Sequence, residues 1–244
     1  MRIIAVDNIE DMGEAAADLI IEKIISKPDC VLGLATGSTP LSLYIRLIRA
    51  YEQKTVSYKE VKSFNLDEYR GLEQDNPNSY HYYMKENLFK YIDILPENTY
   101  LPSGTMDADE AIRTYKELLK DHQIDIQVLG IGTNGHIGFN EPGVSFESSV
   151  HLVELDEQTI EDNSRYFESL DDVPKQAITM GIADIMAAKS IILMAGTENK
   201  KNALRCVLEG PVTDECPASI LRKHKGLTIV ALKNVLNEIS LNLL

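Results

Sequence analysis

A histidine and a glutamate lie five residues apart in a stretch of the chain that is rich in glycine. This stretch, residues 130–143 (GIGTNGHIGFNEPG), holds five of the 14 glycines together with His136 and Glu141. A histidine paired with a carboxylate is held in one tautomer and can exchange protons near neutral pH. The sequence therefore predicts proton transfer at His136, with Glu141 as its partner; a purely structural histidine is the alternative.

The same stretch allows two local structures. Asn134-Gly135 could form a two-residue turn between two hairpin strands. Gly132 and Gly138 would weaken both of these strands, and Pro142 follows at once. A broad loop lined by backbone therefore fits the sequence better than a hairpin.

A second loop, residues 36–40 (TGSTP), leaves an apolar run and enters a helical pattern. Helix capping by Ser38 or Thr39, with Pro40 in the first turn, would account for these residues alone. The free N–H groups of a helix start also favour a phosphate, and Gly37 lets the backbone approach it closely. The loop lacks the lysine of a Walker A motif. The sequence favours phosphate binding by Thr36, Gly37, Ser38 and Thr39, and capping stays the alternative.

Two adjacent carboxylates, Asp67 and Glu68, end the apolar run FNLDEY. A carboxylate here could simply cap the turn or the next helix. Because neighbouring side chains of an extended strand point to opposite sides, only one of the two can face a pocket. If that residue is Asp67, it is a candidate general base.

Short apolar runs alternate with helical patterns along the whole chain, and these elements must position the three loops. No linker or repeat divides them, so the sequence predicts one α/β domain over residues 1–244. Its sheet is expected to be open, mostly parallel and Rossmann-like, with helices on both faces and ligands bound beyond the carboxyl ends of the strands. Strands are expected at residues 2–6, 30–36, 61–69, 124–132, 150–155, 190–196 and 227–232, and helices at 9–27, 41–53, 80–92, 107–120, 178–189 and 200–210.

The composition excludes several classes of partner. A formal net charge of -14 disfavours nucleic acid and anionic lipid. No basic region leads into an apolar run at the N-terminus and no apolar stretch is long enough to span a bilayer, so we expect a cytoplasmic protein without a membrane partner. Three cysteines cannot all pair and show no metal-ligand spacing, and we interpret them as ordinary thiols.

Six segments together resemble the glucosamine-6-phosphate deaminase family, and the match runs nearly end to end. They are ATGSTP, FNLDEYRGL, NPNSYHYYM, GIGTNGHIGFNEPG, NSRYF and VPKQAITMGI. Single motifs such as GSTP also resemble 6-phosphogluconolactonases and sugar-binding regulator domains, whereas LDEY combined with NGHIGFNEP is specific to the deaminases. The resemblance implies conversion of glucosamine 6-phosphate and water into fructose 6-phosphate and ammonia in amino-sugar catabolism, without a metal or an organic cofactor.

The resemblance also implies a division of the catalytic roles. His136 assists opening of the sugar ring, Glu141 orients and polarises that histidine, and Asp67 removes the proton from C2 to give an enolamine. Many family members carry Asp where this chain has Asn134. Asn cannot supply a negative charge, but it can still hydrogen-bond and preserve the geometry of His136.

The phosphate, by the same resemblance, is held by residues 36–39, by Arg165 of NSRYF and by Lys200 of TENKK. Lys201 is the alternative to Lys200, because the alignment there can shift by one residue. Residues 157–173, which carry Arg165, resemble the mobile lid that family members close over the sugar.

Two other functions stay open from the sequence. A lactonase acting on a related sugar phosphate would have less need of a separate base at Asp67. A non-catalytic sugar-phosphate sensor would normally need a DNA-binding domain, and no helix-turn-helix pattern precedes the first expected strand. Longer members of the family form hexamers that are activated between subunits, at a site that extra C-terminal residues help to build. Because this chain stops soon after its last expected strand, we expect a monomer or a small homo-oligomer.

Overall fold

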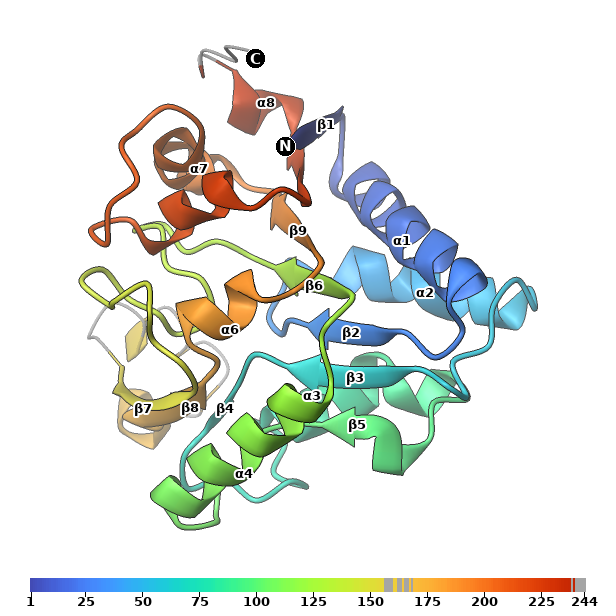
Figure 1. The fold of residues 1–244 in the computed structure, drawn as a ribbon, viewed down its shortest axis with the longest axis vertical. Coiled ribbons are helices and arrows are strands. Elements are labelled where there is room, and N and C mark those ends of the chain that lie inside the picture. The colour runs from blue at the N-terminus through green and yellow to red at the C-terminus, as the bar shows by residue number, and fades with distance from the viewer. Residues whose placement is uncertain (156–159, 162–163, 165–166, 168, 238, 240–244) are drawn as a thin grey trace.

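A parallel sheet forms the centre of the computed structural model, which describes residues 1–155, 160–161, 164, 167, 169–237 and 239 (Figure 1). Within these residues the sheet has seven strands in the order β1-β10-β9-β6-β2-β3-β5, and every neighbouring pair is parallel. This confirms the predicted α/β fold with a mostly parallel sheet. The strands are β1 (Arg2–Val6), β2 (Val31–Leu34), β3 (Lys62–Asn65), β5 (Thr99–Tyr100), β6 (Ile126–Leu129), β9 (Ser190–Ala195) and β10 (Leu227–Leu232).

Helices flank the sheet, and their sequences explain where they begin and what they cover. The side chain of Asn8 accepts a hydrogen bond from the N–H of Asp11 (2.8 Å) and so caps α1. Met12, Ala16 and Ile20 recur at helical spacing on the buried side of α1, which packs against α2 and β10. The helices are α1 (Ile9–Ser26), α2 (Leu41–Glu52), α3 (Tyr80–Asn87), α4 (Ala108–Asp121), α6 (Ile182–Met186), α7 (Lys201–Leu208) and α8 (Lys233–Leu236). Within the described residues, no helix combines the length and the apolar character that crossing a bilayer requires.

A small antiparallel sheet, which the sequence did not predict, stands beside the main one. It has the order β4-β8-β7, with β4 (Asp67–Tyr69), β7 (His151–Glu154) and β8 (Gln176–Thr179). The single strand expected over residues 61–69 is therefore wrong, because the chain changes sheets at Leu66. The N–H of Leu66 still bonds to Leu34 of β2 (3.3 Å), while its carbonyl accepts from the N–H of Met180 (2.7 Å). This change of sheet turns Asp67 away from the main sheet and into β4.

The helix expected over residues 178–189 is also wrong at its start. Residues up to Thr179 belong to β8, and α6 begins only after Gly181. A short apolar run is compatible with either element, and pairing with β4 and β7 favours the strand.

The expectation of three ordinary thiols is wrong for two of the cysteines. Cys206 of α7 and Cys216 form a disulfide, with their Cα atoms 6.7 Å apart, and Cys30 is a buried free thiol. The return of the chain after α7 brings Cys216 back to the helix, and nothing in the spacing of the cysteines predicts this return.

Candidate active site

Loops that follow parallel strands line one cavity of about 520 Å³. They follow β2, β6 and β9, which are neighbours in the sheet, and β4 with α3 closes another side. The three segments predicted from the sequence, residues 36–40, 67–69 and 130–143, therefore meet at one place, although residues 67–69 form strand β4 and not a loop. The cavity is lined by Thr36, Gly37, Ser38, Thr39, Asp67, Tyr80, His136 and Lys200, among others.

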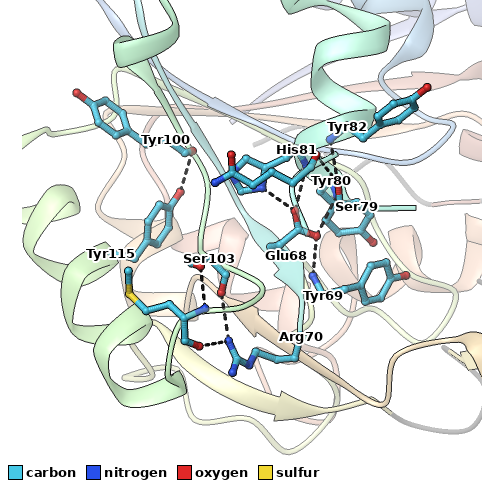
Figure 2. Close-up of polar contacts among 12 residues, drawn as sticks. Glu68, Tyr69, Arg70, Ser79, Tyr80, His81, Tyr82, Tyr100, Ser103 and Tyr115 are labelled. Carbon is cyan, nitrogen blue, oxygen red and sulfur yellow. Dashed lines mark hydrogen bonds and ion pairs between the residues drawn. The ribbon is translucent and has the colours of Figure 1, made fainter. Parts of the chain in front are cut away.

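Asp67 faces the cavity and Glu68 faces away from it, as expected for neighbours on one strand. The Asp67 side chain is buried, with 7% of the residue exposed, whereas Glu68 points towards the start of α3 (Figure 2). Burial, and next to it the negative charge of Glu68, raises the pKa of Asp67 from 3.8 to about 8. A carboxyl group with a pKa in this range can take up and release a proton near neutral pH.

His136, Glu141 and Asn134 form one hydrogen-bonded group. Both carboxylate oxygens of Glu141 lie 3.2 Å from Nδ1 of His136. The amide of Asn134 donates to Glu141 (2.7 Å), and its oxygen accepts from the backbone N–H of His136 (3.1 Å). Asn134 therefore ties the histidine backbone to the glutamate side chain, although it carries no charge.

Two glycines in residues 130–143 make room for this group. A Cβ at Gly132 would lie 2.5 Å from the imidazole of His136. Gly138 has a φ of +57°, and a Cβ there would lie 3.0 Å from Oγ1 of Thr179 and 3.6 Å from the Asp67 carboxylate. The concentration of glycine thus lets the loop pass close to both His136 and Asp67. No strand is formed within residues 130–143, so the hairpin with its turn at Asn134-Gly135 is not formed; the one isolated bridge in this stretch, between Ile137 and Asn140, encloses a different turn.

The loop at residues 36–40 does not use its hydroxyl groups to cap the helix. Pro40 is the residue that precedes α2, and no side chain caps the helix start. Thr36, Ser38 and Thr39 line the cavity instead, and Gly37 has a φ of +88°. This geometry favours a ligand at the loop over capping alone.

The other expected phosphate ligands are placed in part. Lys200 lines the cavity, while Lys201, the first residue of α7, is not among the described residues that line it. Arg165 lies outside the described residues, and so does part of the expected lid at residues 157–173.

The sequence interpretation missed Tyr80, which it treated as a packing residue. Tyr80 lies in the cavity wall, and the hydroxyl of Tyr83 donates to the carbonyl of Gly37 (2.5 Å). Thr197 and Asn199 in the loop after β9 were also missed as lining residues. The signal for these two was their place after a parallel strand, where ligands bind.

Among the described residues, no group of three or more His, Cys, Asp or Glu side chains could hold a metal ion.

Comparison with known proteins gives matches over nearly the whole chain. The family described as glucosamine-6-phosphate isomerases/6-phosphogluconolactonase matches residues 6–230. A glucosamine-6-phosphate deaminase of Mycoplasma mycoides subsp. mycoides SC is 48% identical over 241 residues, covering 98% of each chain. One from Clostridium acetobutylicum is 48% identical over 94% of this chain and 96% of its own.

Two solved structures are similar to this chain, one in both sequence and fold and the other in fold alone. The structure of a monomeric glucosamine-6-phosphate deaminase has a TM-score of 0.94 and 43% identity, covering 96% of this chain and 98% of that one. The 6-phosphogluconolactonase of Leishmania guyanensis covers 98% of both chains with a TM-score of 0.75, but it is only 22% identical. The second comparison shows a shared fold alone.

Proposed function

The chain belongs to the glucosamine-6-phosphate isomerase/6-phosphogluconolactonase family, and from this premise we propose that it converts glucosamine 6-phosphate and water into fructose 6-phosphate and ammonia. The observation that carries the proposal is the arrangement around one cavity. A buried carboxylate, Asp67, and a separate histidine, His136, which is held by Glu141, both line the cavity beside the 36–40 loop. Ring opening and isomerisation need proton transfer at different atoms of the sugar, so two separately placed groups suit this reaction.

The phosphate group anchors the substrate in this proposal. Backbone N–H groups and hydroxyls of residues 36–39 receive it at the start of α2, and Lys200 adds a positive charge from the loop after β9. Arg165, on the proposed lid at residues 157–173, adds a two-pronged contact. Residues 1–244 act as one domain in which the lid closes over the sugar and excludes water.

Ring opening is assigned to His136. Its Nδ1 is held by Glu141, which leaves Nε2 to move the proton between O1 and O5 of the sugar. Asn134 holds the Glu141 side chain and the backbone of His136 in position through its two hydrogen bonds. Glu141 supplies the negative charge within this hydrogen-bonded group, because Asn134 is neutral.

Isomerisation is assigned to Asp67. As a carboxylate it takes the proton from C2 of the opened sugar, which gives an enolamine. Protonation at C1 gives an imine at C2, and water releases this nitrogen as ammonia to leave fructose 6-phosphate. A group with a pKa of about 8 suits both the removal and the return of a proton.

The partner is a phosphorylated amino sugar, and the net charge of -14 argues against nucleic acid. We propose cytoplasmic activity without a metal or an organic cofactor. We also propose that the protein works as a monomer or a small homo-oligomer, because a relative with 43% identity over 96% of this chain is monomeric.

The function is tested by mixing purified protein with glucosamine 6-phosphate and measuring ammonia and fructose 6-phosphate. Glucosamine without phosphate is the matched control for the anchor, and 6-phosphogluconolactone is the control for the lactonase alternative. Formation of both products from glucosamine 6-phosphate alone supports the proposal. Hydrolysis of the lactone without release of ammonia would overturn it.

A further inference from the structure

Glu68 is a buried carboxylate that the proposed mechanism leaves without a task. Only 1% of its surface is exposed, and its two oxygens have four N–H partners (Figure 2). One oxygen accepts from the backbone N–H groups of Tyr69 (2.8 Å) and Tyr80 (3.0 Å). The other accepts from the backbone N–H of His81 (3.0 Å) and lies 2.8 Å from Nδ1 of the His81 ring. Burial of this charge is therefore compensated by hydrogen bonds in every direction.

These contacts fix the start of α3. Helix starts leave N–H groups without a partner inside the helix, and a negative charge is favourable there. Glu68 occupies the N–H groups of Tyr80 and His81, and Oγ of Ser79 accepts from the third, that of Tyr82 (3.0 Å). Because the backbone of Tyr80 is bonded to Glu68, the direction of the Tyr80 side chain depends on this carboxylate.

Tyr80 connects the parts of the active site. Its ring lies in the cavity wall and stacks on Phe139 of the glycine-rich loop, with centroids 6.3 Å apart and planes at 13°. It also contacts the ring of Tyr69 (centroids 4.8 Å apart), and it lines the cavity together with Thr36 of the 36–40 loop. A shift of Tyr80 would therefore be felt at the phosphate loop and at the loop of His136 together.

We propose that Glu68 is a positioning residue for the deamination, a role that rests on the proposed function: it holds Tyr80 in the cavity wall and places a buried negative charge directly behind Asp67. Both effects go beyond the stability of α3, because one acts on a residue of the cavity wall and the other on the proposed base. The two effects depend on different properties of Glu68. Its length holds Tyr80, and its charge acts on Asp67.

The charge effect can be measured through the pKa of Asp67. Burial is the largest cause of its raised pKa, and the negative charge of Glu68 is the second. Removal of this charge makes Asp67 easier to deprotonate, since like charges disfavour each other. In the part of the chain that the structure describes, the titratable and charged groups around Asp67 are Glu68 on its own strand, Tyr80 of α3, Tyr115 of α4, His136 and Lys200.

Two substitutions separate length from charge. Glu68→Gln keeps the length and one oxygen that can accept from the N–H of Tyr80, and it removes the charge. The acidic limb of the kcat/KM profile therefore moves to lower pH by about 1 unit. Glu68→Asp keeps the charge and is too short to reach the helix start. The acidic limb of the kcat/KM profile of this variant stays at the wild-type pH, while kcat/KM itself falls by up to about 100-fold because Tyr80 loses its position. Glu86→Gln, the same change on the outer side of α3, is the matched control and leaves both quantities unchanged.

The outcome that overturns the proposal is a folded Glu68→Gln with the wild-type pH profile beside a folded Glu68→Asp with the wild-type kcat/KM. A purely structural Glu68 would lower the melting temperature in both variants without moving the pH limb. If either variant does not fold, Tyr80→Leu replaces the length test, and an unchanged kcat/KM in that variant overturns the positioning role.

A measurement without substrate separates this proposal from the proposed function. The Asp67 carboxyl carbon is titrated by NMR in the wild type and in Glu68→Gln. We expect a midpoint well above the usual value in the wild type and a lower midpoint in the variant. A wild-type midpoint near pH 4, or equal midpoints in both proteins, overturns the charge effect. Absence of ammonia release by the wild type would count against the deaminase activity alone, and this titration would still decide the charge effect of Glu68.

Discussion

Asp67→Asn is expected to make the protein more stable while it removes the proposed base. The Asp67 carboxyl has a pKa of about 8 in the folded chain against an ordinary value of 3.8, because it is buried and next to Glu68. Between these two values the folded chain keeps a proton that the unfolded chain releases. The folded state therefore carries no penalty from Asp67 below pH 3.8. As the pH rises towards 8, this stability is lost and the raised pKa becomes a penalty in the free energy of unfolding. Asn has the same shape, stays neutral and does not carry this penalty.

The magnitude follows from the same two pKa values. Each unit of pKa difference corresponds to about 1.4 kcal/mol, and about 3 units of the range lie below pH 7, so the penalty at pH 7 is up to about 4 kcal/mol. Water in the cavity and local relaxation reduce it, and we expect Asp67→Asn to gain about 2 to 4 kcal/mol. For a chain of this size, each kcal/mol raises Tm by about 2 to 4 °C.

The assay compares urea unfolding of wild type and Asp67→Asn from pH 5 to pH 9, beside the ammonia-release assay. The gap in free energy of unfolding should widen from pH 5 to 8 and then stay constant, while turnover falls by about 10² to 10⁴. Asp75→Asn, which changes an exposed carboxylate, is the control and should track the wild type. A gap that does not depend on pH refutes the reasoning about Asp67. Wild-type exchange of the C2 proton with solvent in Asp67→Asn would refute its assignment as the base.

Three further predictions concern ring opening, the phosphate and assembly. His136→Gln should lose most activity on the closed-ring substrate while open-chain analogues still bind, and equal losses of affinity for both ligands would indicate a structural histidine. Arg165→Ala and Lys200→Ala should each weaken binding of phosphorylated sugars by about 1.5 to 3 kcal/mol, measured by calorimetry. Lys201→Ala is the neighbouring control, and a larger effect there would reverse the assignment. The substrate saturation curve should be hyperbolic with and without N-acetylglucosamine 6-phosphate, and sedimentation should show a monomer or small oligomer. A hexamer with sigmoidal, effector-sensitive kinetics would contradict this.

The parts of the fold that the sequence predicts are those with a strong local signal. The helical spacing of Met12, Ala16 and Ile20 and the buried run at β9 each specify one element without knowledge of the rest. The convergence of the three loops follows in turn, because parallel neighbours end at the same edge of a sheet. The opposite directions of Asp67 and Glu68 follow from the alternation of an extended strand.

The features that the sequence does not predict depend on contacts between distant segments. β4 separates from β3 because Met180 takes the carbonyl of Leu66, and residues 66 and 180 give no sign of this pairing in their own neighbourhoods. The bond between Cys206 and Cys216 depends in the same way on where the chain returns after α7. The sequence alone indicates that Tyr80 is a packing residue, and its place in the cavity wall becomes clear only from the contact of its backbone N–H with Glu68. Each of these needs the tertiary structure before the local residues acquire a meaning.

The two carboxylates of β4 show how one strand can supply both a reactive group and its support. Hydrogen bonds from N–H donors favour a charged carboxylate, and burial disfavours it. Glu68 lies among four such donors, whereas the pKa of Asp67 is raised chiefly by burial at the cavity. Adjacent positions on a strand must face opposite sides, so the chain can place these environments one residue apart. Burial of Asp67 therefore both lowers the stability of the folded chain and raises the pKa that suits proton transfer. A substitution that removes the carboxylate is expected to raise the stability and to abolish the proton transfer.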